Sequence, residues 1–233
     1  MINLSIIIPV YNELETLKIF TQKLFKTFEN ENIEYIFIND GSDDGSTELL
    51  KEIIKNKSKL KCKLINLNHN MGKGNAIHEG IKISIGQYVL FQDADLELKT
   101  DDSLEMLKII NNNNINCLFG SRYLAGNLNK NNNYLNKFFV KLNSFLFNIL
   151  FKQSLSDLHC GTKIISKKIL EELNLTIKDF GFEIDIASQI AKKKYPIYEH
   201  GISYFARNKK DGKKITWIDG LKSYYYLFKT RFL

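Results

Sequence analysis

The sequence has few cysteines, no long apolar run and no leader pattern. Its three cysteines, Cys62, Cys117 and Cys160, lack metal-ligand spacing, and their odd number argues against a disulfide framework. A reducing cytosol is therefore the expected compartment. No stretch reaches the roughly 18 uncharged apolar residues that a membrane span needs. The start, "MINLSIIIPVYN", has no basic region ahead of its apolar run, so we expect no signal peptide.

Arginine is scarce, whereas lysine is abundant. The 33 basic residues include three arginines, Arg122, Arg207 and Arg231, and the formal net charge is +7. Most of this surplus lies in 207–233, where eight basic residues stand against two acidic ones, a net charge of +6. A basic segment of this kind attracts phosphate groups, whether on a nucleotide, a lipid headgroup or a nucleic acid.

Apolar runs and helical patterns alternate along the chain. The expected strands are 4–10, 34–39, 61–67, 86–93 and 115–121. The expected helices between the first four strands are 13–29, 46–55 (with Ser46 as its cap) and 73–84. This serial order predicts an α/β fold with a mainly parallel central sheet and helices on both faces.

A polar cluster follows each of the first four expected strands. These clusters are "YNE", "NDGSDDGS", "NHNMGKG" and "DADLE". Ligands of parallel sheets bind beyond the carboxyl ends of the strands, so we expect the four loops to form one site. The third cluster is neither a Walker A motif nor a dinucleotide fingerprint, which excludes those two classes of nucleotide site.

The fourth cluster carries carboxylates at alternate positions, Asp93, Asp95 and Glu97. If the chain stays extended, these three side chains point to the same side. Three like charges at one spot repel unless their pKa values shift or a cation binds, and Mg²⁺ or Mn²⁺ would relieve the repulsion. The alternative is a solvated acidic loop before a helix whose first turn holds Asp101 and Asp102. Spacing alone leaves both interpretations open.

Segment 134–152 has an amphipathic helical pattern. Its apolar face comprises Leu135, Phe138, Phe139, Leu142, Phe145, Leu146 and Ile149, and its polar face Lys137, Lys141, Ser144, Asn148 and Lys152. One interpretation is a helix packed on the core. The other is an interfacial helix that touches a membrane, because the helix is rich in phenylalanine and its charges are all lysine.

Taken together, the polar motifs resemble those of one enzyme family. They are "PVYNE" (9–13), "NDGSDDGS" (39–46), "NMGKGNAI" (70–77), "QDADLE" (92–97), "GSRY" (120–123), "CGTK" (160–163) and "GFEID" (181–185). In this order the chain resembles the family 2 glycosyltransferases, and among them the polyprenyl-phosphate hexosyltransferases, such as dolichol-phosphate mannose synthases. The resemblance implies a three-layer GT-A fold over 1–206, followed by a basic, aromatic tail over 207–233.

The resemblance also implies a metal-dependent inverting transferase that moves a hexose from a UDP- or GDP-linked sugar to a polyprenyl phosphate. It places Asp93 near the ribose and the metal, and Asp95 and Glu97 on Mg²⁺ or Mn²⁺. The remaining donor contacts that it implies are Pro9, Tyr11, Glu13, Asp40 and Lys73. Basic residues expected to reach the phosphates of donor and acceptor are Arg207, Lys213 and Lys214.

Arg122 and Glu183 are the other candidate catalytic residues. The planar fork of Arg122 suits a phosphate, and its alternative role is a structural salt bridge. Glu183 and Asp185 do not share a helix face, and the motif favours Glu183 as a base. A base is needed if the acceptor is a sugar hydroxyl on a glycan, but not if it is a lipid phosphate, which is already an anion. His159 and Cys160 form no metal set and are expected to be a loop residue and a packing residue.

Two alternatives to the lipid-phosphate transferase stay open. One uses the same donor with a glycan hydroxyl as acceptor, as in cell-surface polysaccharide synthesis. The other is a non-catalytic basic module that binds an anionic membrane or nucleic acid; no nucleic-acid-binding motif is present, so we expect no nucleic-acid partner. The expected location is the cytoplasm, at the cytoplasmic face of a membrane.

Overall fold

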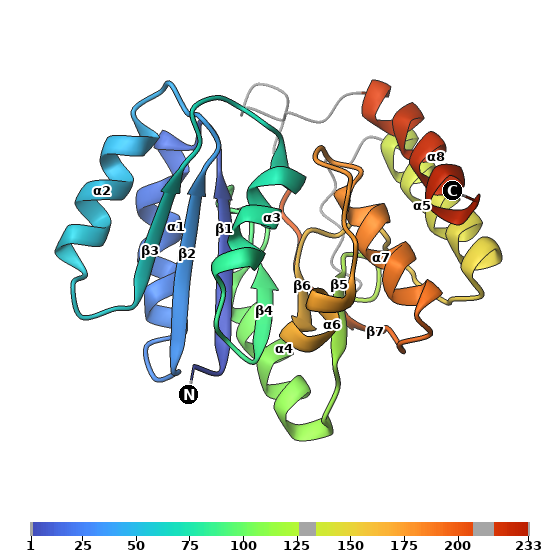
Figure 1. Ribbon diagram of the computed structural model, residues 1–233, viewed down its shortest axis with the longest axis horizontal. Helices are drawn as coiled ribbons and strands as arrows, with labels where there is room; N and C mark the ends of the chain where they lie inside the picture. The colour runs from blue at the N-terminus through green and yellow to red at the C-terminus, as the bar shows by residue number, and fades with distance from the viewer. Residues whose placement is uncertain (1, 126–133, 207–216, 233) are drawn as a thin grey trace.

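The protein is built around one mixed sheet flanked by helices (Figure 1). The computed structural model describes the chain except residues 1, 126–133, 207–216 and 233. Its strands are β1 (Leu4–Val10), β2 (Ile33–Asn39), β3 (Cys62–Asn66), β4 (Tyr88–Phe91), β5 (Cys117–Ser121), β6 (Lys163–Ser166) and β7 (Tyr198–Gly201). Its helices are α1 (Leu14–Thr27), α2 (Ser46–Asn56), α3 (Lys73–Ile83), α4 (Thr100–Asn113), α5 (Tyr134–Phe151), α6 (Lys167–Glu172), α7 (Phe182–Lys192) and α8 (Trp217–Phe232).

The strand order across the sheet is β3-β2-β1-β4-β6-β5-β7. Strands β1 to β4 are parallel, and β5 is parallel to β7, whereas β6 runs antiparallel to both β4 and β5. The predicted mainly parallel sheet is therefore confirmed. Strands β6 and β7, each four residues long, were not predicted from the sequence.

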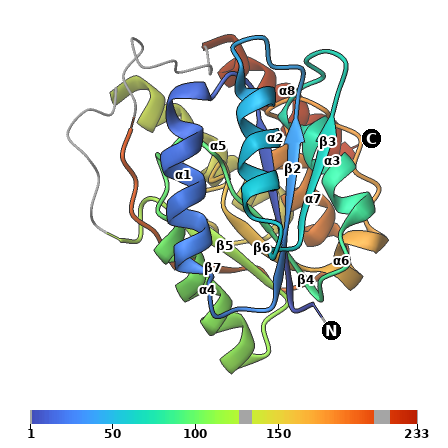
Figure 2. The ribbon, with the colours of Figure 1, turned by 90° about the vertical axis from the view of Figure 1, so that its left-hand side faces the viewer.

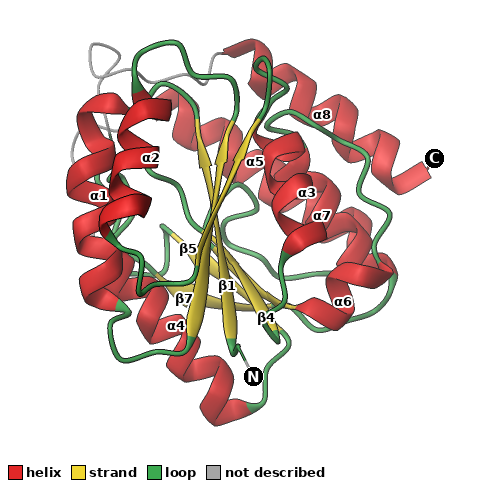
Figure 3. Cartoon of the chain, turned by 60° about the vertical axis from the view of Figure 1, so that its left-hand side comes forward, coloured by secondary structure: helices red, strands yellow, loops and turns green. Residues whose placement is uncertain are grey.

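Two apolar cores lie on opposite faces of the sheet, because successive side chains of β1 point to opposite sides. Ile6 and Ile8 join the core under α1, α2 and α4, whereas Ile7 joins the core under α3, α5, α6 and α7. Figure 3 shows the strands between these two helical layers. The predicted three-layer arrangement is confirmed.

Helix α5 forms where it was predicted, but it buries a different face. Asn143, Ser144 and Phe147 are buried, whereas Phe145 and Ile149 are 59% and 60% exposed. Helix α8 packs against α5 and α7 but does not cover Phe145 and Ile149. Instead, the Asn143 amide donates a 2.6 Å hydrogen bond to the Ser223 hydroxyl of α8. The assignment of Ser144 to an outward polar face was wrong.

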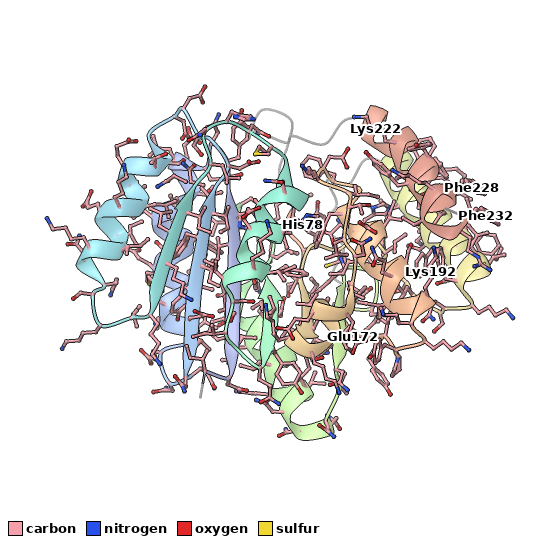
Figure 4. All side chains as sticks on the ribbon, viewed as in Figure 1. His78, Glu172, Lys192, Lys222, Phe228 and Phe232 are labelled. Atoms are coloured by element: carbon pink, nitrogen blue, oxygen red, sulfur yellow. The ribbon has the colours of Figure 1, made fainter. Side chains whose placement is uncertain are left out.

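Helix α8 leaves its own apolar stripe exposed. Tyr225, Phe228 and Phe232 are 62%, 48% and 69% exposed, and Figure 4 shows Phe228 and Phe232 on the outer side of the helix. Within the described residues, no helix combines the length and apolar character needed to cross a membrane. Helix α8 lies within the expected tail, 207–233, and packs on α5 and α7. The division of the chain at residue 206 stays a prediction.

Candidate active site

The carboxyl ends of β1 to β3 meet at one edge of the sheet, the upper edge in Figure 2. The loops after β1 and β2 are joined there by hydrogen bonds. Asn12 and Asp43 form a reciprocal pair, with Asn12 Nδ2 donating to Asp43 Oδ1 at 2.8 Å and the Asp43 amide donating to Asn12 Oδ1 at 3.0 Å. Two of the expected polar loops therefore form one rigid rim.

The second loop also supplies the cap of α1. The Leu14 amide donates to Asp44 Oδ2 at 3.0 Å, and the Glu13 amide donates to the Ser46 hydroxyl at 3.1 Å. Ser46 was predicted to cap its own helix. It is instead the first residue of α2, whose cap is Gly45 with φ of 96°, and its hydroxyl serves the neighbouring helix.

Asp40 ties the third loop to the rim. Its two carboxylate oxygens accept the Met71 amide at 2.8 Å and the Gly72 amide at 2.9 Å. Burial raises the pKa of Asp40, although these two amides act in the opposite direction. In this arrangement Asp40 positions the loop ahead of α3, and its predicted contact with the nucleoside stays a prediction.

The glycine-rich start of α3 packs against protein backbone. The Asn75 amide donates to the Lys178 carbonyl at 2.9 Å. Gly72 has φ of 95°, and a Cβ on it would lie 2.6 Å from the same carbonyl oxygen. The loop between α6 and α7 therefore already bonds one amide in the first turn of α3.

The other predicted donor contacts lie at the end of β1. Pro9 pairs with Ile38 in the sheet, and Tyr11 is half-buried just beyond the strand. The Glu13 carboxylate is buried and accepts the Thr16 hydroxyl at 3.0 Å. These residues lie at the carboxyl end of β1, where they were expected, and their roles toward a donor stay predictions.

The acidic motif does not continue β4 as an extended strand. The strand ends at Phe91, and Leu96 has φ of 61°, which turns the chain. Asp95 Oδ1 accepts the Glu97 amide at 3.0 Å, a local turn rather than a pleat. Burial, and after it the nearby Glu97 carboxylate, raise the pKa of Tyr204, and the Glu97 carbonyl accepts the Phe205 amide at 2.9 Å. The extended geometry on which the alignment of the three carboxylates depended is therefore not present in this loop.

A hard cation nevertheless fits the chemistry of this loop. Over the part of the chain that the structure describes, no three acidic, histidine or cysteine side chains converge into a ready-made metal site. Mg²⁺ is commonly held by one or two carboxylates, with substrate phosphates supplying further oxygens. Asp95 and Asp93 have the right donor atoms for that arrangement, and Glu97, whose charge acts on Tyr204, is the weaker candidate.

Four charged side chains form a chain beneath the acidic motif. Lys73 Nζ lies 2.8 Å and 3.0 Å from the two oxygens of Asp93 and 3.3 Å from Glu183 Oε1. The other oxygen of Glu183 is bonded to Lys163, which is fully buried. Burial opposes the charge of Lys73, but Asp93 and then Glu183 outweigh it and raise its pKa.

The two acids of "GFEID" have different partners. Asp185 Oδ2 accepts the amides of Thr176 and Ile177 at 2.7 Å and 3.0 Å, whereas Glu183 faces the two lysines. Lys163 was not singled out in the sequence, although it ends the quoted "CGTK" motif. A lysine at the start of a buried strand needs a counter-ion, and this requirement could have predicted an acidic partner for Lys163.

Arg122 is held by a partner, Asp157, that was not predicted from the sequence. Its Nε and Nη2 donate to the two oxygens of Asp157 at 2.7 Å and 2.8 Å, and its guanidinium lies 5.2 Å from the centre of the Tyr204 ring. Asp157 is fully buried, and although burial opposes its charge, Arg122 holds its pKa below the usual range. The observed contacts are those of the structural salt bridge.

His159 and Cys160 lie beside this pair. Burial raises the pKa of the Cys160 thiol to about 12, as befits a packing residue. His159 Nε2 is buried and has no hydrogen-bond partner among the described residues. Burial is the main cause that lowers the pKa of His159 to about 4; Arg122 and Lys163 act in the same direction, and Asp157 opposes them. The remaining predicted contacts, Arg207, Lys213 and Lys214, lie outside the described residues.

We expect His159 to make the protein less stable in mild acid. The ring is neutral in the folded chain but takes up a proton below pH 6.5 when unfolded, so stability is full above pH 6.5 and falls as the pH drops toward 4. The loss attributable to this residue is about 3 kcal/mol. Urea unfolding at several pH values should show a flatter pH dependence for His159→Asn than for the unchanged protein. Equal slopes would contradict the buried, neutral state.

Comparison with known sequences gives one family match and several relatives. Residues 5–174 match the family described as Glycosyl transferase family 2. A dolichyl-phosphate beta-glucosyltransferase of Dictyostelium discoideum is 29% identical, with 92% of this chain and 69% of that protein covered. A protein named for the same activity in Trichomonas vaginalis is 28% identical, with 91% and 67% covered. An uncharacterised protein of Methanocaldococcus jannaschii is 28% identical, with 84% and 86% covered.

Solved structures share the fold at low identity. Glucosyl-3-phosphoglycerate synthase of Mycobacterium tuberculosis, in complex with Mn²⁺, UDP and phosphoglyceric acid, has a TM-score of 0.74 at 14% identity, with 99% of this chain and 79% of that one covered. Its complex with Mg²⁺ and UDP has a TM-score of 0.70 at 13% identity, with 98% and 79% covered. These similarities confirm the predicted GT-A fold.

Proposed function

The chain belongs to glycosyl transferase family 2, and from this premise we propose that it transfers a hexose from a nucleotide sugar to a polyprenyl phosphate with inversion at the sugar C1. Two relatives are named as dolichyl-phosphate beta-glucosyltransferases, which supports an acceptor of this class. The observation that carries the choice of acceptor is the placement of Glu183 between Lys73 and Lys163.

That placement argues against a general base. A base must be within hydrogen-bond reach of the acceptor hydroxyl and ready to take its proton. Glu183 is buried, with one carboxylate oxygen bonded to Lys163 and the other 3.3 Å from the ammonium of Lys73, so it lies between two cations and not at an open surface. A phosphate acceptor needs no such base, because the attacking oxygen is an anion before the reaction starts. Glu183 is therefore assigned as a positioning residue.

The donor is proposed to lie along the edge formed by the loops after β1 to β4. Its nucleoside would contact the rim that contains Pro9, Tyr11, Glu13 and Asp40, and its diphosphate would lie near Lys73. Asp95 and Asp93 would hold Mg²⁺ or Mn²⁺, with Glu97 as a further ligand if its loop rearranges. When bound, the cation would neutralise charge on the leaving diphosphate. The related fold that binds Mn²⁺ with UDP supports this arrangement.

The proposed reaction is a single displacement. An oxygen of the acceptor phosphate bonds to the sugar C1 as the bond from C1 to the diphosphate oxygen breaks, and the electron pair leaves with the nucleoside diphosphate. Lys73 is the described cation nearest the acidic motif, and it would bind the departing diphosphate. Arg207, Lys213 and Lys214 are proposed to contact phosphates, whereas Arg122 is proposed to hold Asp157 and its loop in place.

The exposed stripes of α5 and α8 support peripheral contact with a membrane. Phe145 and Ile149 on α5, and Phe228 and Phe232 on α8, project apolar surface that the fold does not cover. Lys222 and Lys229 on α8 add positive charge that suits anionic headgroups. We propose that this surface lies against the cytoplasmic face of a membrane and presents the phosphate end of the acceptor.

We expect label from a nucleotide sugar to enter the organic phase with polyprenyl phosphate as acceptor. The assay supplies Mn²⁺ and a panel of radiolabelled UDP- and GDP-hexoses, with a soluble glycan in parallel. Transfer to the lipid alone supports the proposal. Transfer to the glycan alone would overturn it and return Glu183 to the role of base. No transfer to either, with no nucleotide binding, would favour the non-catalytic basic module.

A further inference from the structure

The charged chain beneath the acidic motif alternates in sign and is neutral as a whole. It runs Lys163, Glu183, Lys73, Asp93, with a salt bridge between each member and the next. Lys163 is fully buried, and the side chains of Glu183, Lys73 and Asp93 are 6%, 16% and 25% exposed. Charges this far from water depend on one another, because an unpaired member would bear the full cost of desolvation.

Lys73 occupies the position that a cation bound to Asp93 would need. Its ammonium contacts both oxygens of Asp93, at 2.8 Å and 3.0 Å, so neither oxygen is without a positive partner. Asp95 also acts on Lys73 as a nearby negative charge. Lys73 therefore already relieves the repulsion between the carboxylates that a divalent cation was expected to relieve.

The surrounding structure keeps Lys73 in this place. Lys73 is the first residue of α3, and the loop before it is fixed by the two amide bonds to Asp40. Gly161 lies against the ion pair: a Cβ there would overlap Asp93 Oδ2 and lie 2.9 Å from Lys73 Nζ. The close approach of "CGTK" to Asp93 thus requires glycine, and the pair is enclosed from that side.

We propose that Lys73 is an internal counter-ion that makes metal binding conditional on the nucleotide. This inference rests on the proposed function. A divalent cation that arrives alone meets Asp93 already neutralised and a second positive charge less than 4 Å from its ligand. A nucleoside diphosphate brings the negative charge that draws the ammonium of Lys73 away from Asp93, and it supplies oxygens to both cations. Metal and nucleotide therefore bind strongly together and weakly apart.

The test measures Mn²⁺ binding by electron paramagnetic resonance, without turnover. Free Mn²⁺ is titrated with the full chain alone, then with UDP or GDP present, for the unchanged protein, Lys73→Met and Lys73→Gln. Lys82→Met is the matched control, because Lys82 lies on the same helix, is exposed and contacts Glu79. Gln can still donate a hydrogen bond to Asp93, so it guards against misfolding of the Met variant.

Removing the charge of Lys73 is expected to tighten Mn²⁺ binding in the absence of nucleotide by roughly tenfold or more. The factor by which the nucleotide improves Mn²⁺ affinity should shrink correspondingly, since the coupling between two ligands is reciprocal. Lys82→Met should behave like the unchanged protein. If both Lys73 variants bind Mn²⁺ alone no more tightly than the unchanged protein, the inference is overturned while the metal site stands. If no protein binds Mn²⁺ with either nucleotide, the proposed metal site fails as well.

Discussion

Asp95→Asn is expected to lower the rate of hexose transfer by about 10³-fold, which corresponds to about 4 kcal/mol of transition-state stabilisation. The fold should survive. Asp95 Oδ1 accepts the Glu97 amide at 3.0 Å, and the carbonyl oxygen of an asparagine side chain can accept the same bond. What the substitution removes is the negative charge that would bind a cation. The measurement is transfer of label at saturating Mn²⁺, together with the melting temperature.

Asp101→Asn is the matched control for this experiment. Asp101 lies six positions further along, is exposed, and accepts the Thr27 hydroxyl at 3.2 Å. Its substitution should leave transfer within about twofold, because an exposed carboxylate away from the site contributes little. Full activity of Asp95→Asn in the presence of EDTA would show that the acidic motif does not act through a metal.

Arg122→Met is expected to destabilise the protein by about 3–5 kcal/mol, because it leaves the fully buried carboxylate of Asp157 without its partner. The guanidinium contacts that carboxylate through two hydrogen bonds and also lies over Tyr204, so packing is lost as well. Urea unfolding at neutral pH measures the change. A loss below about 1 kcal/mol would be typical of an exposed pair and would contradict the structural role.

A second variant separates the salt bridge from the loss of packing. In the double variant Arg122→Met with Asp157→Asn, no charge is left unpaired, so part of the lost stability should return. A double-mutant cycle gives the coupling between the two side chains. If the stability lost by the double variant equals the sum of the losses of the two single variants, the bond between Arg122 and Asp157 does not account for the effect.

The sequence was sufficient for the sheet edge and the fold. Continuous apolar runs such as 4–10 coincide with buried strands, and the polar loops follow these strands as the local sequence pattern predicted. Asp40 and Lys73 were placed at the correct edge for the same reason. The motif order added the GT-A fold, which periodicity alone does not distinguish from other α/β folds.

The partners of the charged residues were not predictable in the same way. Asp157 is 35 positions from Arg122, and Lys163 is 20 from Glu183, so only the folded chain shows which charges pair. The turn at Leu96 also overrode the alternation on which the three-carboxylate site depended. On α5, the amphipathic pattern was correct but its orientation depends on α8, which packs from far along the sequence. The charge pairs and the orientation of α5 thus depend on contacts between segments far apart in the sequence, which local patterns do not predict.

The most direct test of the proposed reaction compares two acceptors that differ in one group. Polyprenyl phosphate and the polyprenol of the same chain length are each incubated with the active labelled nucleotide sugar and Mn²⁺, and product is measured from pH 6 to pH 9. Because the acceptor is proposed to be an anion that needs no base, only the phosphate should be labelled. Equal labelling of the alcohol would show that the enzyme removes a proton from its acceptor, and would contradict the account.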